Sequence, residues 1–202
     1  MTDVLIVADC KSLAPTWETL ANDFILEPNV VVAKVDAEAE NAKSLAREQG
    51  ISGYPTIKFF PKGSKEPEAY QGGRSEQALV DFLNEKAGTH RTVGGGLDEK
   101  AGTISKVDAF VGKYVASRNF QDLVGEIKKS VKGIQSKYAE YYVKVAEKLS
   151  QNQEYAEKEF ARLSKIIQKG GSAPEKVDEL VSRSNILRQF LGGGKRDEKD
   201  EL

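Results

Sequence analysis

The apolar positions in the first part of the chain change their spacing and predict alternating strands and helices. Four short apolar or β-branched runs predict strands, at residues 4–8, 29–35, 56–60 and 68–70. Apolar residues at near-helical spacing predict three helices, at residues 10–24, at residues 41–49 before Gly50, and after a capping Ser75. The order β-α-β-α-β-β-α predicts helices that cover a largely parallel sheet, whose last two strands form an antiparallel hairpin.

The second part of the chain has helical spacing throughout. Apolar residues repeat every three or four positions in five stripes, at residues 107–115, 120–131, 138–149, 156–167 and 177–191. A capping box from Ser172 to Glu175 precedes the last stripe. Five amphipathic helices with short connections predict a small antiparallel bundle, in which the stripes form the core.

Two glycine-rich segments divide the chain, at residues 94–96 and 192–194. They predict an α/β domain over residues 1–88, a linker over 89–96, a helical domain over 97–191 and a flexible tail over 192–202. His90 lies in the linker, and we expect it to be solvated and without a partner.

Composition excludes several classes of protein. Thirty basic and 31 acidic residues give a net charge of −1, without the basic surplus that nucleic-acid binding needs. No apolar run approaches the ~18 residues of a membrane span. The chain has one cysteine and one histidine, which exclude an intrachain disulfide and argue against a zinc site. We therefore expect no metal and no cofactor.

The two ends of the chain carry conflicting signals about its location in the cell. The last four residues, Lys199, Asp200, Glu201 and Leu202, match the KDEL signal that retains soluble proteins in the endoplasmic reticulum. They predict a place in the lumen of that compartment and binding to the KDEL receptor. The first ten residues have no basic segment and only a short apolar run, so no signal peptide is visible. We interpret the chain as a fragment, a splice form or a truncated gene model.

Several motifs, in the right order, resemble the protein disulfide isomerase family. Residues 10–17 (CKSLAPTW) resemble the helix after the family's Cys-Gly-His-Cys site, 32–37 the next strand, 53–56 (GYPT) the cis-proline loop, and 70–74 (YQGGR) its Tyr-x-Gly-x-Arg. Residues 97–190 resemble the D domain of some fungal and plant members, through patterns that begin at Tyr155, Ser172 and Asn185. The resemblance implies an N-terminally truncated, thioredoxin-like α/β domain followed by an all-α five-helix D domain.

The resemblance also implies roles for three polar residues. Cys10 corresponds to the second, resolving cysteine, and the first cysteine of Cys-x-x-Cys is absent. Cys10 is either a residual thiol that forms mixed disulfides or a buried, inert side chain. Lys34 corresponds to a buried lysine that pairs with a glutamate behind the cysteines, but Val7 stands at the glutamate's place, so Lys34 must reach solvent. Arg74 corresponds to an arginine that tunes the resolving cysteine, or is an exposed cation.

Three further residues correspond to the family's substrate loop. Tyr54, Pro55 and Thr56 match the loop that presents its backbone to an extended substrate, with a cis peptide bond before the proline. The alternative for this loop is a plain turn.

Two functions remain open. The first is thiol–disulfide exchange on folding secretory proteins, impaired in this chain because dithiol exchange needs two sulfurs. The alternative is a non-catalytic chaperone or escort module that binds unfolded or partner proteins; a homodimer is a further option. Tyr138, Tyr141 and Tyr142 either join the helical core or expose an aromatic patch for such partners.

Overall fold

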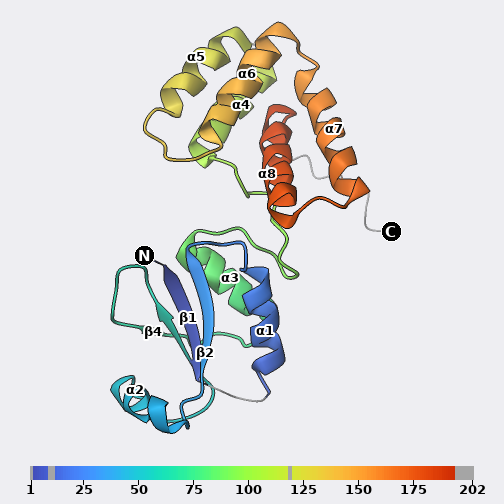
Figure 1. Ribbon diagram of the computed structural model, residues 1–202. Helices are drawn as coiled ribbons and strands as arrows, with labels where there is room; N and C mark the ends of the chain where they lie inside the picture. Colours follow the sequence, from blue (N-terminus) through green and yellow to red (C-terminus); the bar gives the residue numbers. More distant parts are fainter. Residues whose placement is uncertain (1, 9–11, 118–119, 194–202) are drawn as a thin grey trace. The chain divides into compact units, whose positions relative to one another are not determined.

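The computed structural model describes residues 2–8, 12–117 and 120–193. Its contacts divide the chain into two compact units, Met1–Asp98 and Glu99–Leu202, which are described separately below (Figure 1).

The first unit contains a four-stranded sheet in the order β2-β1-β3-β4. Its strands are β1 (Asp3–Ala8), β2 (Val30–Val35), β3 (Thr56–Phe60) and β4 (Glu68–Ala69). β1 pairs in parallel with β2 and antiparallel with β3, and β3 pairs antiparallel with β4. The predicted strands and the hairpin are confirmed, and β1 lies inside the sheet.

The expectation of a largely parallel sheet is wrong, because only β1 and β2 are parallel. The cause lies in the connection between β2 and β3. Helix α2 (Lys43–Glu48) has six residues and is about 9 Å long, whereas six-residue β2 extends over about 20 Å. Such a helix does not by itself span the length of the sheet. It stays at the end where β2 finishes (Figure 1), so β3 begins there and runs back.

The other helices of this unit are α1 (Ala14–Asp23) and α3 (Glu76–Ala87), and a short 3-10 turn, η1 (Glu40–Ala42), precedes α2. The helix predicted from residue 10 begins later, at Ala14, because Pro15 favours the first helical turn, where its missing N–H costs nothing. Ser75 caps α3 as predicted, since its Oγ accepts a hydrogen bond from the Ala78 N–H at 3.3 Å.

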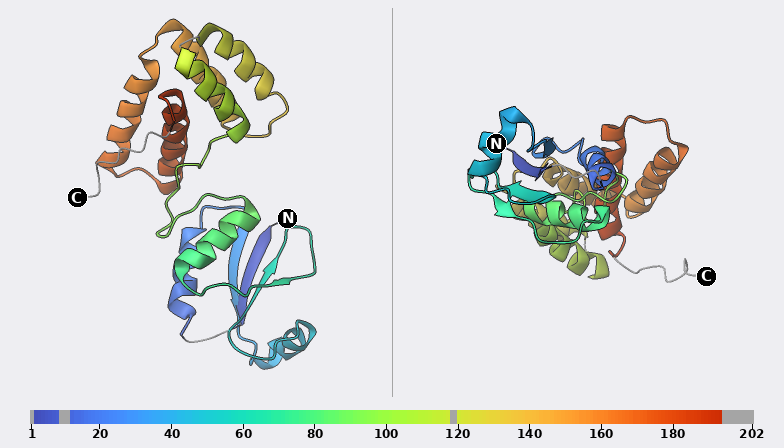
Figure 2. Two further views of the ribbon diagram at one scale, coloured as in Figure 1. Left: turned by 180° about the vertical axis from the view of Figure 1, so that it is seen from behind. Right: turned by 90° about the horizontal axis from the view of Figure 1, so that it is seen from below.

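Helices α1 and α3 pack side by side on one face of the sheet (Figure 2). The core between them and the sheet is apolar and includes Leu5, Trp17, Leu20, Ile57, Phe59, Leu79 and Leu83. The indole Nε1–H of Trp17 donates to the Ala33 carbonyl at 2.9 Å. This bond joins α1 to β2. Together with the core contacts, it holds the start of α1 against the sheet.

The second unit is helical in its described residues, with α4 (Ser105–Ser117), α5 (Phe120–Ser130), α6 (Ala139–Gln151), α7 (Tyr155–Lys169) and α8 (Pro174–Phe190). The five predicted stripes are therefore helices, and their apolar residues form one core. The capping box at Ser172 is wrong. Residue Ala173 is the N-cap and makes no side-chain bond, because Pro174 suits the first helical position and starts the helix there.

The tyrosines of the second unit belong to its core. Tyr142 is fully buried, Tyr141 is 8% exposed, and Tyr138 packs against the same cluster. The interpretation of these residues as an exposed aromatic patch is therefore wrong. Tyr141 and Tyr142 can both be buried, with Tyr138 half-buried before them, because the neighbouring helices enclose α6 on more than one side.

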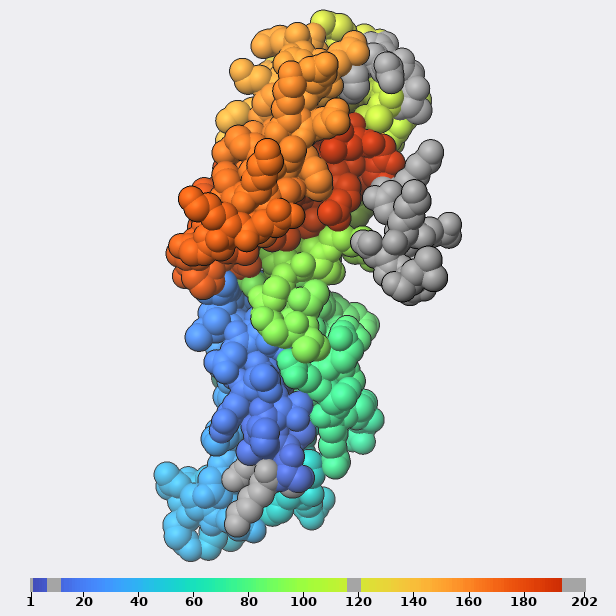
Figure 3. Space-filling model, turned by 90° about the vertical axis from the view of Figure 1, so that its right-hand side faces the viewer, coloured from blue at the N-terminus to red at the C-terminus, as the bar shows by residue number. Residues whose placement is uncertain are grey.

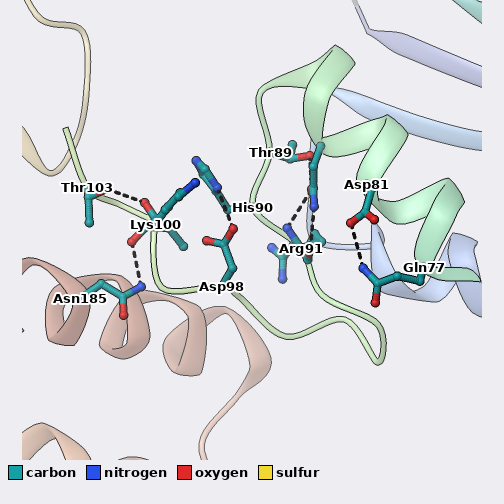
Figure 4. A network of polar contacts seen from close by, with 11 residues as sticks. Gln77, Asp81, Thr89, His90, Arg91, Asp98, Lys100, Thr103 and Asn185 are labelled. Carbon is teal, nitrogen blue, oxygen red and sulfur yellow. Dashed lines mark hydrogen bonds and ion pairs between the residues drawn. The ribbon is translucent and has the colours of Figure 1, made fainter. Parts of the chain in front are cut away.

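Residues 89–98 form a hydrogen-bonded loop on the first unit. Arg91 pairs with Leu97 in an isolated bridge, and the Asp98 N–H donates to the His90 carbonyl at 3.0 Å. The expectation that His90 has no partner is wrong, because its Nδ1 lies 3.1 Å from Oδ2 of Asp98 (Figure 4). The loop folds back on itself, which brings two residues eight positions apart together.

Candidate functional site

The candidate site lies at the end of the sheet where β1 and β2 finish. Ala8, the last residue of β1, is the register partner of Val35 at the end of β2 and of Thr56 at the start of β3. The chain leaves β1 here and re-enters the described structure at Ser12, just before α1. The end of β1, the loop before β3 and the approach to α1 therefore share one edge of the unit.

The segment 53–56, here called the Pro55 loop, occupies this edge. Its Tyr54–Pro55 peptide bond is cis, as the motif predicts. The Oγ1–H of Thr56 donates to the Gly53 carbonyl at 2.6 Å and closes the turn. Tyr54 is 49% exposed, and Pro55 and Thr56 are half-buried. The loop thus presents its backbone and the Tyr54 ring at the surface, beside the end of β1.

Lys34 points to solvent, as expected. It is the register partner of Val7, and its side chain is 57% exposed. Its Nζ lies 3.9 Å from Oε1 of Glu18, a residue of α1 that is itself 71% exposed. Glu18 was missed in the sequence because it is sixteen positions away on another element. An exposed pair at this distance is weak and leaves Lys34 in contact with water.

Arg74 follows a tight turn that places it before α3. The Oη–H of Tyr70 donates to the Gly73 carbonyl at 2.6 Å, and the Tyr70 ring lies 4.7 Å from the ring of Phe82. A Cβ at Gly72 would be 2.5 Å from the Tyr70 Oη, so only glycine fits there. Arg74 itself is exposed, and no ion pair to it occurs among the described residues.

The remaining predicted site residues, Cys10 and the terminal Lys199, Asp200, Glu201 and Leu202, lie outside the described residues. Within residues 2–8, 12–117 and 120–193, the structure brings the Pro55 loop to the end of β1. It does not bring Lys34 or Arg74 into polar contact with that loop. In the same ranges, no group of three or more His, Cys, Asp or Glu side chains could hold a metal ion.

An apolar cavity adjoins the Pro55 loop on the side of the sheet that carries α2. It is lined mainly by apolar side chains from β1, β3 and α2, among them Ile6, Leu45, Ile51, Thr56 and Phe60. Leu45 is 44% exposed at its rim. The sequence could not reveal this cavity, because it forms only when α2 stays at the end of the sheet. None of the described helices is long and apolar enough to cross a membrane.

Two family models match the chain, one for each unit. The thioredoxin model matches residues 7–85. The model described as endoplasmic reticulum protein ERp29, C-terminal domain, matches residues 102–190. The predicted fold class is therefore confirmed: a thioredoxin-like α/β domain with a mixed sheet, followed by an ERp29-type helical domain.

Several relatives match across almost the whole chain. Protein disulfide-isomerase tigA of Aspergillus niger is 68% identical over 193 residues, which are 96% of this chain and 52% of the relative. Protein disulfide-isomerase erp38 of Neurospora crassa is 54% identical over 197 residues, 96% of this chain and 53% of the relative. Protein disulfide isomerase-like 2-2 of Oryza sativa is 38% identical over 187 residues, 90% of this chain and 50% of the relative.

The chain spans about half the length of these relatives. Both of its units agree with them, since the matches run through the α/β unit and the helical unit in one alignment. Over almost its whole length, the chain is therefore similar to proteins of the protein disulfide isomerase family, with a thioredoxin-like domain followed by an ERp29-type helical domain.

Proposed function

We propose that this chain takes part in thiol–disulfide exchange on folding secretory proteins in the lumen of the endoplasmic reticulum. The observation that carries the proposal is the register of Ala8 with Thr56. Cys10 follows Ala8 by two positions in the sequence. The proposal is that its thiol acts on an extended client that the backbone of the Pro55 loop holds at this edge of the sheet.

The chemistry available to one thiol is limited. The Cys10 thiolate attacks one sulfur of a client disulfide, a new S–S bond forms, and the other client sulfur leaves as a thiolate that takes up a proton. The chain has no second cysteine to release the client from this mixed disulfide. An external thiol must therefore do so. We therefore expect mixed-disulfide formation with little dithiol turnover.

The test compares the full chain with Cys10→Ser. We expect the native chain to form one glutathione adduct with oxidised glutathione, detected by mass spectrometry, and to reduce insulin only slowly. Cys10→Ser should form no adduct. Absence of an adduct on the native chain would refute the exchange function. Rapid insulin reduction that Cys10→Ser abolishes would instead show that Cys10 alone is a working nucleophile, and that the activity is not impaired.

A non-catalytic chaperone function is the second candidate, and the apolar cavity beside the Pro55 loop favours it. The exposed Leu45 at its rim, together with the half-exposed Tyr54, offers a surface for apolar client side chains. On this reading, the native chain and Cys10→Ser suppress the aggregation of an unfolded client equally well. Leu45→Ser should weaken the suppression without unfolding the chain. Equal suppression by Leu45→Ser would exclude the cavity as the client site.

The proposed location depends on the terminal KDEL sequence. A secreted reporter that carries residues 192–202 at its C-terminus should remain inside cells, because the receptor recognises the free terminal signal. Removal of Leu202 should release the reporter to the medium. Secretion of both forms would contradict retention by this segment.

A further inference from the structure

The cavity beside α2 lies on the face of the sheet that α1 and α3 leave uncovered. Ile57 and Phe59 of β3 point into the core beneath α1 and α3. Because side chains alternate between the two faces of a strand, Thr56, Lys58 and Phe60 point the other way, and all three line the cavity. The cavity is therefore separate from the apolar core of the first unit.

The walls of the cavity are mostly apolar and partly open to solvent. Ile6, Val35, Ile51 and Phe60 are half-buried, and Leu45 on α2 is 44% exposed. None of these five side chains belongs to the core of the unit. Figure 3 shows the segment that contains α2, in light blue, at one end of the unit. With its open mouth included, the cavity has a volume of about 420 Å³, near the lower end of the range of small-molecule sites.

One charged side chain lines this cavity without a counter-ion. Lys58 is half-buried, and its Nζ donates to the Gln49 carbonyl at the end of α2. An ammonium group has three N–H donors, so this bond leaves two of them. Among the described residues, no carboxylate lines the cavity and none pairs with Lys58. A half-buried ammonium in an apolar wall is costly unless an acceptor reaches it.

A second polar side chain lines the cavity next to Lys58. Gln49 is half-buried, and its side-chain amide makes no hydrogen bond within the described part of the chain. Its backbone carbonyl accepts from the Lys58 Nζ, so the amide and the ammonium belong to the same wall. The same bond offsets part of the negative charge that the carbonyls at the end of α2 carry. The cavity thus combines apolar walls with two neighbouring sets of N–H donors.

We propose that this cavity binds a short aliphatic carboxylate. The alkyl chain packs against Ile6, Leu45 and Phe60, and the carboxylate accepts hydrogen bonds from the Lys58 ammonium and the Gln49 amide. The charge of Lys58 selects the head group, because it attracts a carboxylate, gives an alcohol a weaker bond and repels a charged amine. The site goes beyond the proposed function, since it needs neither a thiol nor a client protein.

The experiment titrates the full chain with octanoate, octan-1-ol and octylammonium, each below the concentration at which it aggregates, and follows the methyl groups by carbon-13 NMR. We expect octanoate to shift the methyl signals of Ile6, Leu45 and Ile51 in a saturable way. Octan-1-ol should bind about tenfold more weakly, because it lacks the charged bond to Lys58. Octylammonium should bind more weakly than octan-1-ol, since its charge repels that of Lys58.

Three variants test the head-group contact and the cavity. Lys58→Met keeps a side chain of similar length without the charge, so the octanoate affinity should fall about tenfold and that of octan-1-ol should not. Lys65→Met, which changes an exposed lysine between β3 and β4, is the matched control and should leave both affinities unchanged. Ala46 lines the cavity from α2, and Ala46→Leu should fill it and abolish the binding of all three ligands. Trp17 fluorescence checks that the first unit of each variant is folded.

Four results would overturn the site. The first is the absence of a saturable shift at these methyl groups. The second is equal binding of octanoate and octylammonium to the native chain, a comparison that stands even if Lys58→Met does not fold. The third is an unchanged octanoate affinity in Lys58→Met, since Lys58 would then only cap α2. The fourth is binding that survives in a folded Ala46→Leu. The client function is judged separately, by Leu45→Ser in the aggregation assay, and neither result decides the other.

Discussion

Two neighbouring hydroxyl groups on α6 should respond in opposite ways to the same substitution. Tyr142 is fully buried; its Oη–H donates to a carboxylate oxygen of Asp108 and its Oη accepts from the Ile104 N–H at 3.0 Å. Tyr141 is also buried, but its Oη has no hydrogen-bond partner among the described residues. Tyr142→Phe and Tyr141→Phe thus delete a bonded and an unbonded hydroxyl in the same helix.

The change in the free energy of unfolding depends on the hydrogen bonds that each substitution removes. Tyr142→Phe costs one hydrogen bond to a charged group, about 1.5–3 kcal/mol, and one ordinary bond, about 1 kcal/mol. We expect the free energy of unfolding to fall by about 3 kcal/mol. Tyr141→Phe removes a polar atom that is buried without a partner, so the chain should be unchanged or more stable by up to about 1 kcal/mol. The Arg183 guanidinium, 5.1 Å from the centre of ring 141, can still pack on a phenyl ring.

The loss in Tyr142→Phe should also depend on pH. Burial raises the pKa of Asp108, and the bond from Tyr142 opposes that rise. Without the hydroxyl, burial acts unopposed and the pKa of Asp108 rises further. A raised pKa in the folded state stabilises the protein at low pH, and this contribution is lost as the pH rises through it. The deficit of Tyr142→Phe should therefore shrink as Asp108 becomes protonated.

Urea denaturation of the full chain followed by far-UV circular dichroism measures both variants. Trp17, the only tryptophan, reports on the first unit by fluorescence, so its transition identifies effects that are not confined to the helical unit. If the two variants differ by less than about 0.5 kcal/mol, the assignment of the Tyr142 bonds as stabilising is refuted.

Two further substitutions test the turn before α3 and the exposed lysine. Gly72→Ala should destabilise the first unit by about 1–3 kcal/mol, because its Cβ would collide with Tyr70 and break the bond to Gly73; an unchanged urea midpoint by Trp17 fluorescence would contradict the close approach. Lys34→Gln should change stability by less than about 0.5 kcal/mol, since its pair with Glu18 is exposed and 3.9 Å long; a larger loss would show that Lys34 has a stronger partner.

Strands and helices were predictable where one local signal decides them. β3 begins and ends at the predicted residues. Ser75 caps α3 as predicted, because its side-chain oxygen accepts a hydrogen bond from a backbone N–H in the first turn of the helix. The start of α8 could not be read from its capping box, since the fixed φ of Pro174 outweighs the serine two positions earlier. The direction of β3 depended on the length of α2, which the apolar pattern of residues 41–49 overstated.

The candidate site was predictable only in part, because its geometry depends on contacts between distant residues. The Pro55 loop carries a local motif, and its position beside Ala8 follows from the strand order. The environment of Arg91 carries no such signal. A charged residue in a glycine-rich segment is expected in water, yet Arg91 is buried because Glu27, 64 positions away, accepts from it.

β2 forms one side of the sheet, and no described strand pairs with its outer edge. Its sequence, VVVAKV, is almost entirely β-branched and apolar, with Lys34 as the single charge. Exposed edges of this kind tend to pair between molecules and start aggregation, and a lysine at such an edge acts as a gatekeeper. The Trp17 indole already occupies the Ala33 carbonyl on this strand. We therefore expect Lys34 to oppose pairing between the β2 edges of two molecules, a role that its small effect on stability would not reveal.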